Sequence, residues 1–236
     1  MSYVSVWNTR PSATAPNSPY QVAGKIESAW ATYSTEIEAV NHGISETVSG
    51  SARTTKGAPG ARTAVGGFTR FGAEVLGQGY PWSGGETAGS DYSGPIFRTR
   101  AFVPTSTDFA YIAIGTNDAY YLIQPLETID NLRWMIEHWI STAGMPANHL
   151  FIATLPPNTP SNSTIMPQIN NGIRALATEK GVNLIDIASY TSDDNGLTWK
   201  SASMHVGDSA HYAESVRDWI ASQIVARMAE VTAPPQ

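Results

Sequence analysis

Five short apolar runs, each followed by turn-forming residues, limit most strongly how this chain can fold. They cover residues 3–7, 36–41, 109–114, 150–155 and 182–187. Apolar runs of this length are typical of strands that are buried on both faces of a sheet. Because helical patterns lie between them, the alternation of strands and helices predicts a parallel sheet with right-handed crossovers.

Apolar residues that recur every three or four positions predict four helices around this sheet. One helix follows Pro19, another begins near Pro125, a third covers residues 165–180 and ends at Gly181, and the last precedes the C-terminal tail. The residues expected on the buried faces of the other three helices are Val22, Ile26, Trp30, Ile129, Leu132, Ile136, Trp139 or Ile140, Tyr212, Val216, Ile220 and Ile224. The pattern predicts a flavodoxin-like α/β fold, three-layer α/β/α with a five-stranded parallel sheet; another doubly wound strand order is the alternative.

One segment, residues 49–106, interrupts this alternation. It is rich in glycine, threonine, arginine and aromatic residues, and it shows no long helical period. We interpret it as an insertion of loops and a small hairpin over the active face; a satellite cluster packed on the domain is the alternative. A chain of 236 residues suffices for one core, so we expect a single domain over residues 1–236.

Charge and composition argue against several classes of function. The net charge is −6 with only 14 basic residues, whereas a nucleic-acid partner would require a basic stripe. No run of 18 apolar residues occurs, so we expect no membrane span. The absence of cysteine excludes disulfides and thiolate catalysis and fits either redox compartment. No signal peptide is visible, and the sequence leaves the compartment and the oligomeric state open.

Polar residues that follow the predicted strands form the candidate site, because open parallel sheets bind ligands at the carboxyl ends of their strands. Asn117 follows the third strand within the string GTND, and Gly43 follows the second strand within NHGIS. Asp208 lies three residues before His211, at a spacing that lets its carboxylate orient the imidazole through Nδ1 and leave Nε2 as a general base. The Asn117 amide and the Gly43 N–H can then form an oxyanion hole.

These three segments resemble the SGNH (GDSL) hydrolases. In that family a strand ends in Gly-x-Asn-Asp, a glycine after the second strand supplies an oxyanion N–H, and a late Asp-x-x-His supplies the acid and base. The resemblance implies these roles for Asn117, Gly43, Asp208 and His211. The order and the spacing of the segments agree with the family over nearly the whole chain outside the insertion.

The family's nucleophile block has no direct match in this chain. The first strand of the family leads into Gly-Asp-Ser, whereas the segment here is NTRPSAT. Two extra residues place Ser12 on the serine, and we favour this alignment because an oxyanion hole and an acid–base pair serve acyl transfer when a nucleophile faces them. Alignment without a gap places Arg10 there, which leaves Thr9 as a second candidate or an altered site. The string GDS at residues 207–209 follows no clear strand and belongs to the late block.

The resemblance implies a serine ester hydrolase, of the acetylesterase kind, that acts on short acyl esters. The polar, aromatic-bearing insertion favours O-acetyl groups of carbohydrate, so the expected partner is a small ester or an acylated saccharide. We expect no cofactor and no metal, because metal-binding histidine spacings and glycine-rich nucleotide motifs are absent. The alternative is a catalytically degraded SGNH-fold module that binds carbohydrate.

Each motif also has a purely structural interpretation. Asp208 can cap the last helix, and GTND alone can be a turn. His205 competes with His211 as the base, although no aspartate lies three residues before it. The string DDNG at residues 193–196 faintly resembles a calcium loop, but the other ligand positions are missing, so we predict a solvated turn.

Overall fold

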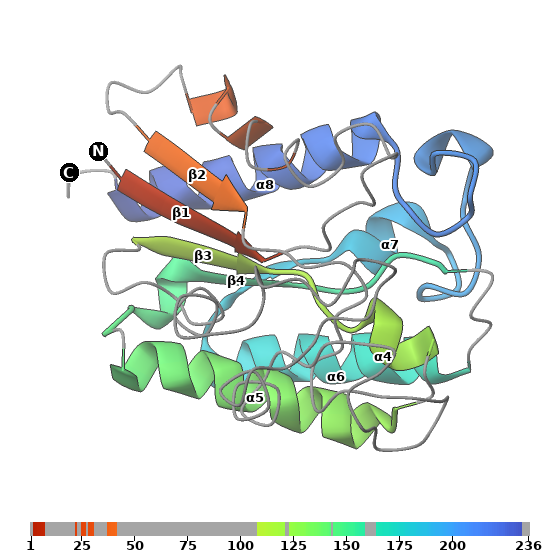
Figure 1. The fold of residues 1–236 in the computed structure, drawn as a ribbon, viewed down its shortest axis with the longest axis horizontal. Helices are drawn as coiled ribbons and strands as arrows, with labels where there is room; N and C mark the ends of the chain where they lie inside the picture. Colours follow the sequence, from red (N-terminus) through yellow and green to blue (C-terminus); the bar gives the residue numbers. More distant parts are fainter. Residues whose placement is uncertain are drawn as a thin grey trace, which may run out of the picture.

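The computed structural model describes residues 2–7, 22, 25, 26, 28–30, 37–41, 108–120, 123–142, 144–158 and 164–232. Their strands form one parallel sheet in the order β2-β1-β3-β4-β5 (Figure 1). The strands are β1 (Ser2–Trp7), β2 (Ile37–Asn41), β3 (Phe109–Ile112), β4 (Leu150–Ala153) and β5 (Asn183–Ile185). The α/β class predicted from the sequence is confirmed, and this strand order is the flavodoxin-like one.

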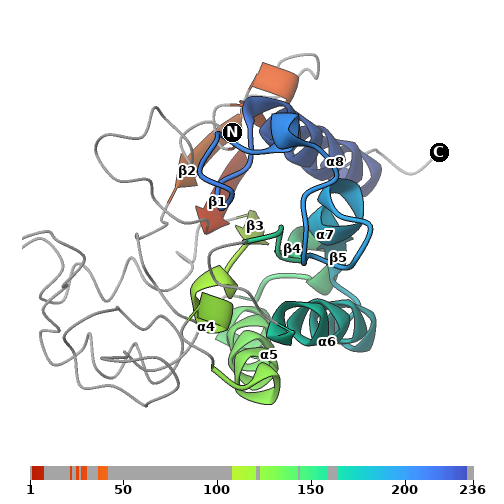
Figure 2. The same cartoon turned by 90° about the vertical axis from the view of Figure 1, so that its right-hand side faces the viewer.

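Helices cover both faces of the sheet. Figure 2 looks onto the carboxyl ends of the strands, with α5 and α6 on one face and α7 and α8 on the other. The longer helices are α5 (Pro125–Thr142), α6 (Ile165–Lys180) and α8 (Glu214–Thr232), and the short ones are α4 (Thr116–Tyr120) and α7 (Ile187–Thr191). There are also two short 3-10 turns, η2 (Ala147–His149) and η4 (Ala202–Met204).

Strand residues alternate between two apolar clusters, because successive side chains of a strand point to opposite faces. Ile112 and Ile152 pack with the helices α5 and α6. Tyr111 and Phe151 pack instead with α8 and with helical residues around Ile26. The predicted buried residues Val22, Ile26, Trp30, Ile129, Leu132, Ile136, Trp139, Val216, Ile220 and Ile224 are all buried.

Helix boundaries follow local signals closely. Helix α5 begins at Pro125 and α6 spans residues 165–180, as predicted. Gly181 ends α6 in the left-handed conformation, with φ 64°, and its N–H points back to the carbonyl groups of Ala177 and Thr178. Helix α8 starts at Glu214, so the prediction that Tyr212 lies on it was wrong. Tyr212 instead forms an antiparallel bridge with His205.

The turn at residues 193–196, predicted to be solvated, is exposed at Asp193 and buried at Gly196. Gly196 is buried, and the amide of Asn170 packs against it from α6. The Asp194 side chain accepts hydrogen bonds from the backbone N–H groups of Leu197 and Thr198. Burial acts to raise the pKa of Asp194, but its hydrogen bonds outweigh burial and lower the pKa to about 2. The turn is therefore a packed element that anchors the long α7–α8 connection.

The proposed insertion at residues 49–106 lies outside the described residues. None of the helices in the described part of the chain is both long and apolar enough to cross a bilayer.

Candidate active site

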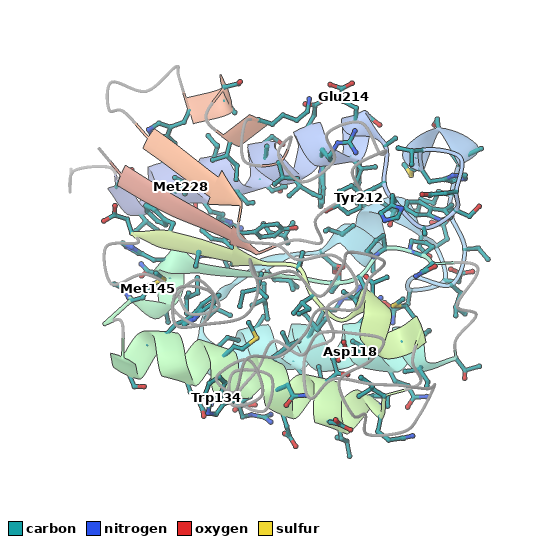
Figure 3. All side chains as sticks on the ribbon, in the orientation of Figure 1. Asp118, Trp134, Met145, Tyr212, Glu214 and Met228 are labelled. Atoms are coloured by element: carbon teal, nitrogen blue, oxygen red, sulfur yellow. The ribbon has the colours of Figure 1, made fainter. Side chains whose placement is uncertain are left out.

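The carboxyl ends of the first three strands meet at one edge of the sheet. Val6 of β1 is in register with Asn41, the last residue of β2, and Trp7 is in register with Ile112, the last residue of β3. The connection between α7 and α8 lies at this same edge (Figure 1). Figure 3 marks the two sides of the edge, with Tyr212 on the α8 side and Asp118 on the α5 side.

Asp208 and His211 contact each other directly in the α7–α8 connection. The Asp208 Oδ2 atom lies 2.5 Å from His211 Nδ1, and Asp208 Oδ1 accepts the backbone N–H groups of Ala210 and His211 at 3.0 and 2.9 Å. A carboxylate only accepts, so Nδ1 carries the proton and Nε2 presents its lone pair. The side chains of His211 and Asp208 are 54% and 45% exposed, and a substrate can therefore reach the imidazole.

Asp208 is held in its ionised form. Burial acts to raise its pKa, but the hydrogen bonds from the His211 and Ala210 N–H groups and from the His211 ring outweigh burial and lower the pKa below its ordinary value. Asp208 is therefore a carboxylate at neutral pH. It can orient the His211 imidazole and stabilise the imidazolium that forms when His211 takes a proton.

A tight turn brings the two side chains together. Val206 N–H donates to the His211 carbonyl at 2.9 Å, and Ala213 N–H donates to the Met204 carbonyl at 2.8 Å. Between these bonds the chain reverses through positive φ angles of 97° at Gly207 and 59° at Ser209. The GDS string therefore forms a turn beside His211.

His205 does not have the surroundings of a general base. Its Nδ1 atom accepts the backbone N–H groups of Gly207 and Ser209 at 3.0 and 3.3 Å. Because an N–H group only donates, the lone pair of Nδ1 is engaged and the ring proton is on Nε2. Of the two histidines, only His211 has a carboxylate at Nδ1 and an Nε2 without a hydrogen bond to another described residue, and the geometry favours it as the candidate base.

The GTND segment begins helix α4 and is tied to the neighbouring helix α5. Gly115 has φ 123° and α4 begins at the next residue, so Asn117 lies in the first turn of this helix. Asp118 is fully buried and accepts a hydrogen bond at 3.0 Å from Thr128 of α5. This bond ties α4 to α5, so GTND is an anchored helix start.

Two predicted site residues, Ser12 and Gly43, lie outside the described residues, and the side chain of Asn117 is not described either. The described neighbours of Ser12 and Gly43, Trp7 and Asn41, are at the shared strand edge. The part of the chain that is described brings no three histidine, aspartate or glutamate side chains into one metal-binding group.

Two residues that support this loop were missed at the sequence level. The Trp199 indole donates to the Ser209 carbonyl at 3.0 Å. Arg217, which is buried in the first turns of α8, donates to the Tyr212 carbonyl at 2.9 Å. The burial of Arg217 could have been predicted, because it lies on the same helix face as Ile220 and Ile224. Trp199 had no comparable signal, because its partner lies in an irregular loop.

Comparison with known proteins agrees with this architecture. The model of the GDSL-like lipase/acylhydrolase family matches residues 26–213, a range that begins after Ser12. No curated protein sequence matches the chain.

Solved structures of similar fold cover almost the whole chain. A lipase/acylhydrolase from Enterococcus faecalis is 13% identical, with TM-score 0.61 and 100% of both chains covered. The aryl esterase of M. smegmatis is 14% identical, with TM-score 0.59, 98% of this chain and 99% of that chain covered. A carbohydrate acetylesterase from Sinorhizobium meliloti is 14% identical, with TM-score 0.60, 98% of this chain and 100% of that chain covered. At these identities the likeness concerns the fold.

Proposed function

This chain belongs to the GDSL-like lipase/acylhydrolase family, and on that premise we propose that it is a serine ester hydrolase acting on short acyl esters. One observation carries the proposal. A carboxylate with a lowered pKa lies 2.5 Å from Nδ1 of an exposed imidazole, at the carboxyl edge of a parallel sheet. Such a pair activates a hydroxyl nucleophile for acyl transfer.

In the proposed reaction the Ser12 hydroxyl attacks the ester carbonyl while His211 Nε2 takes its proton. The oxyanion accepts hydrogen bonds from Asn117 Nδ2, the Gly43 N–H and the N–H of the nucleophile. The imidazolium of His211, stabilised by Asp208, then protonates the leaving alkoxide. A water molecule, deprotonated by His211, attacks the acyl-enzyme carbonyl; the bond to Ser12 Oγ breaks, His211 returns the proton to Oγ, and the carboxylic acid is released. We propose that these residues belong to one domain over residues 1–236.

The proposed substrates are small esters, with O-acetyl groups of saccharides as the preferred class. Two observations support this choice. The carbohydrate acetylesterase from Sinorhizobium meliloti shares the fold over nearly all of both chains. The segment 49–106 is also rich in aromatic residues, which can stack on sugar rings.

The test is hydrolysis of p-nitrophenyl acetate by the wild type, Ser12→Ala, Thr9→Ala and His211→Ala, each first checked for folding by circular dichroism. Loss of activity in Ser12→Ala and His211→Ala, with Thr9→Ala active, supports the proposed triad. If only His211→Ala and Thr9→Ala are inactive, the nucleophile is Thr9. Labelling by a serine-directed phosphonate, followed by mass spectrometry of the labelled peptide, identifies the reacting residue directly.

A second candidate function follows from the segment after the first strand, where the family has its nucleophile. The family match begins at residue 26, and the segment after Trp7 lacks the string Gly-Asp-Ser. A chain that keeps the fold without the nucleophile would bind an acylated saccharide and not cleave it. An inert wild type that binds acetylated oligosaccharides in calorimetry would favour this binding module over the esterase.

A further inference from the structure

His205 makes two hydrogen bonds that the Asp-x-x-His motif does not require. Its Nδ1 atom accepts the N–H groups of Gly207 and Ser209, at 3.0 and 3.3 Å, so the ring is in the tautomer with its proton on Nε2. The backbone of His205 is also bridged to Tyr212, the residue after the proposed base. His205 therefore lies at the start of the turn and holds it through both its ring and its backbone.

The turn needs such support because its conformation is unusual. Ser209 has φ 59°, which residues with a side chain rarely adopt, and Gly207 has φ 97°. Two side chains bind the N–H groups of this turn. The His205 ring holds those of Gly207 and Ser209, and the Asp208 carboxylate holds those of Ala210 and His211. His205 thus holds the part of the turn on either side of Asp208, from Gly207 to Ser209.

Trp199 supports His205 from the preceding segment. The two rings lie 5.3 Å apart between centroids, with an angle of 49° between their planes. The Trp199 indole N–H donates to the Ser209 carbonyl at 3.0 Å. Ser209 is therefore held at both polar groups of its backbone, by His205 at the N–H and by Trp199 at the carbonyl. Since Ser209 is bonded directly to Asp208, this clamp restrains the backbone from which the Asp208 carboxylate extends.

We propose that His205 is a positioning residue whose neutral imidazole, packed on Trp199, holds the turn in which Asp208 orients His211. The inference rests on the proposed esterase and extends it. It assigns a role to a second histidine, which acts through the turn and not on the substrate. A misplacement of the base by about 1 Å can lower turnover roughly 100-fold, so a clamp of this kind acts on kcat.

The test compares two variants that separate the acceptor from the ring. His205→Asn keeps an acceptor, Oδ1, at the same number of bonds from the backbone as Nδ1. His205→Phe keeps an aromatic ring beside Trp199 but offers no acceptor. On p-nitrophenyl acetate we expect His205→Phe to lower kcat about 10- to 100-fold with KM little changed. We expect His205→Asn to keep kcat within about threefold of the wild type.

A second readout does not depend on activity. The His211 Nδ1 proton, held against Asp208, should give a low-field proton NMR signal that disappears in His211→Ala. We expect the signal in the wild type and His205→Asn, and its loss or an upfield shift in His205→Phe. Trp199→Phe removes the indole N–H together with the five-membered ring and serves if His205→Phe does not fold; the same change of the signal is expected.

The outcomes separate this inference from the proposed function. A His205→Phe variant with wild-type kcat and an unchanged His211 signal would overturn the positioning role. An equal loss of kcat in His205→Asn and His205→Phe would also overturn it, because the acceptor would then not be what matters. If the wild type cleaves no ester, the proposed function fails, and the NMR comparison still decides whether His205 positions His211.

Discussion

Arg217 of α8 donates from Nη1 to the backbone carbonyl of Tyr212, 2.9 Å away. Its side chain is buried. Its Nε atom has no hydrogen-bond partner, and no ion pair joins Arg217 to a carboxylate among the described residues. Burial is the main reason that its pKa is lowered. A buried cation with so few hydrogen bonds costs stability, so its contact beside His211 points to a role in holding the α7–α8 connection.

For Arg217→Met we therefore expect turnover to fall without a loss of stability. Methionine fills a similar volume without a buried charge, so the free energy of unfolding should stay equal or rise by about 1 kcal/mol or more. Turnover should fall several-fold, because the Tyr212 carbonyl loses its donor. Urea unfolding and ester hydrolysis measure the two effects, with Arg217→Lys as the charge-keeping control. A large loss of stability in Arg217→Met would instead mean that the guanidinium is a structural anchor.

Asp186 should make stability depend on pH in the acid range. Arg174 donates to both of its carboxylate oxygens at 2.8 Å, and Thr154 and Ser189 donate as well. Burial acts to raise the pKa of Asp186, but these hydrogen bonds outweigh burial and lower the pKa to about 2. A folded-state pKa below the unfolded value, about 3.9, adds stability that is complete above pH 4–5 and is lost as pH falls toward 2.

The substitution Asp186→Asn should therefore cost about 2 kcal/mol at pH 7 and much less at pH 2.5. Part of the loss at pH 7 comes from leaving Arg174 without its carboxylate. Urea unfolding at both pH values measures the difference. Asp193→Asn is the matched control, because Asp193 is 86% exposed and, among the described residues, forms an ion pair with Lys200 alone, across 3.2 Å. Equal effects of the two substitutions at pH 7 would show that the Asp186 network contributes no special stability.

Local signals explain which parts of the fold could be predicted. Pro125 and Gly181 mark the ends of α5 and α6 through their own backbone preferences, and these boundaries were right. Tyr212 has the helical spacing to Val216, yet it forms a bridge with His205 outside α8. Its hydrophobic periodicity was a local signal, whereas the bridge depends on the path of the whole α7–α8 connection.

The same difference applies to the candidate site. Asp208 and His211 are three residues apart, so their contact follows from local geometry and could be anticipated from spacing. The bond from Trp199 to Ser209 joins residues ten apart across an irregular turn, and no periodic pattern encodes it. The acceptor role of His205 likewise depends on the positive φ of Ser209, which nothing in the residue type predicts.

Gly196 should be far less tolerant of alanine than Gly181, although both adopt positive φ. A Cβ atom at Gly196 would lie 2.6 Å from Asn170 Nδ2 and 3.2 Å from the backbone oxygen of Leu155. A Cβ atom at Gly181 would meet nothing within 4 Å. We expect Gly181→Ala to cost about 1 kcal/mol from backbone strain and Gly196→Ala at least about 2–3 kcal/mol.

Chemical denaturation of the two alanine variants measures this difference. Asn170 also forms hydrogen bonds with both the N–H and the carbonyl of Leu155, so a shift of its amide would disturb the segment just after β4. Equal losses in the two variants would show that the clash at Gly196 is relieved without cost.

Asp208→Asn tests whether the carboxylate acts on the tautomer of His211 or only on the turn. The asparagine Oδ1 can still accept the N–H groups of Ala210 and His211, which Asp208 Oδ1 binds at 3.0 and 2.9 Å. Its amide N–H₂ would face His211 Nδ1, so Nδ1 would become an acceptor and the ring proton would move to Nε2. His211 could then no longer take a proton there, and turnover should fall by roughly 10⁴ with little change in stability.

The matched control for this prediction is Asp208→Ala, which removes the turn bonds and the carboxylate together. It should lose turnover to a similar degree and also lose stability, by about 1 kcal/mol or more for the two missing hydrogen bonds of the turn. Ester hydrolysis and urea unfolding of both variants give the comparison. An Asp208→Asn variant with near-wild-type turnover would show that the carboxylate serves the turn alone, and that His211 acts without a charged partner.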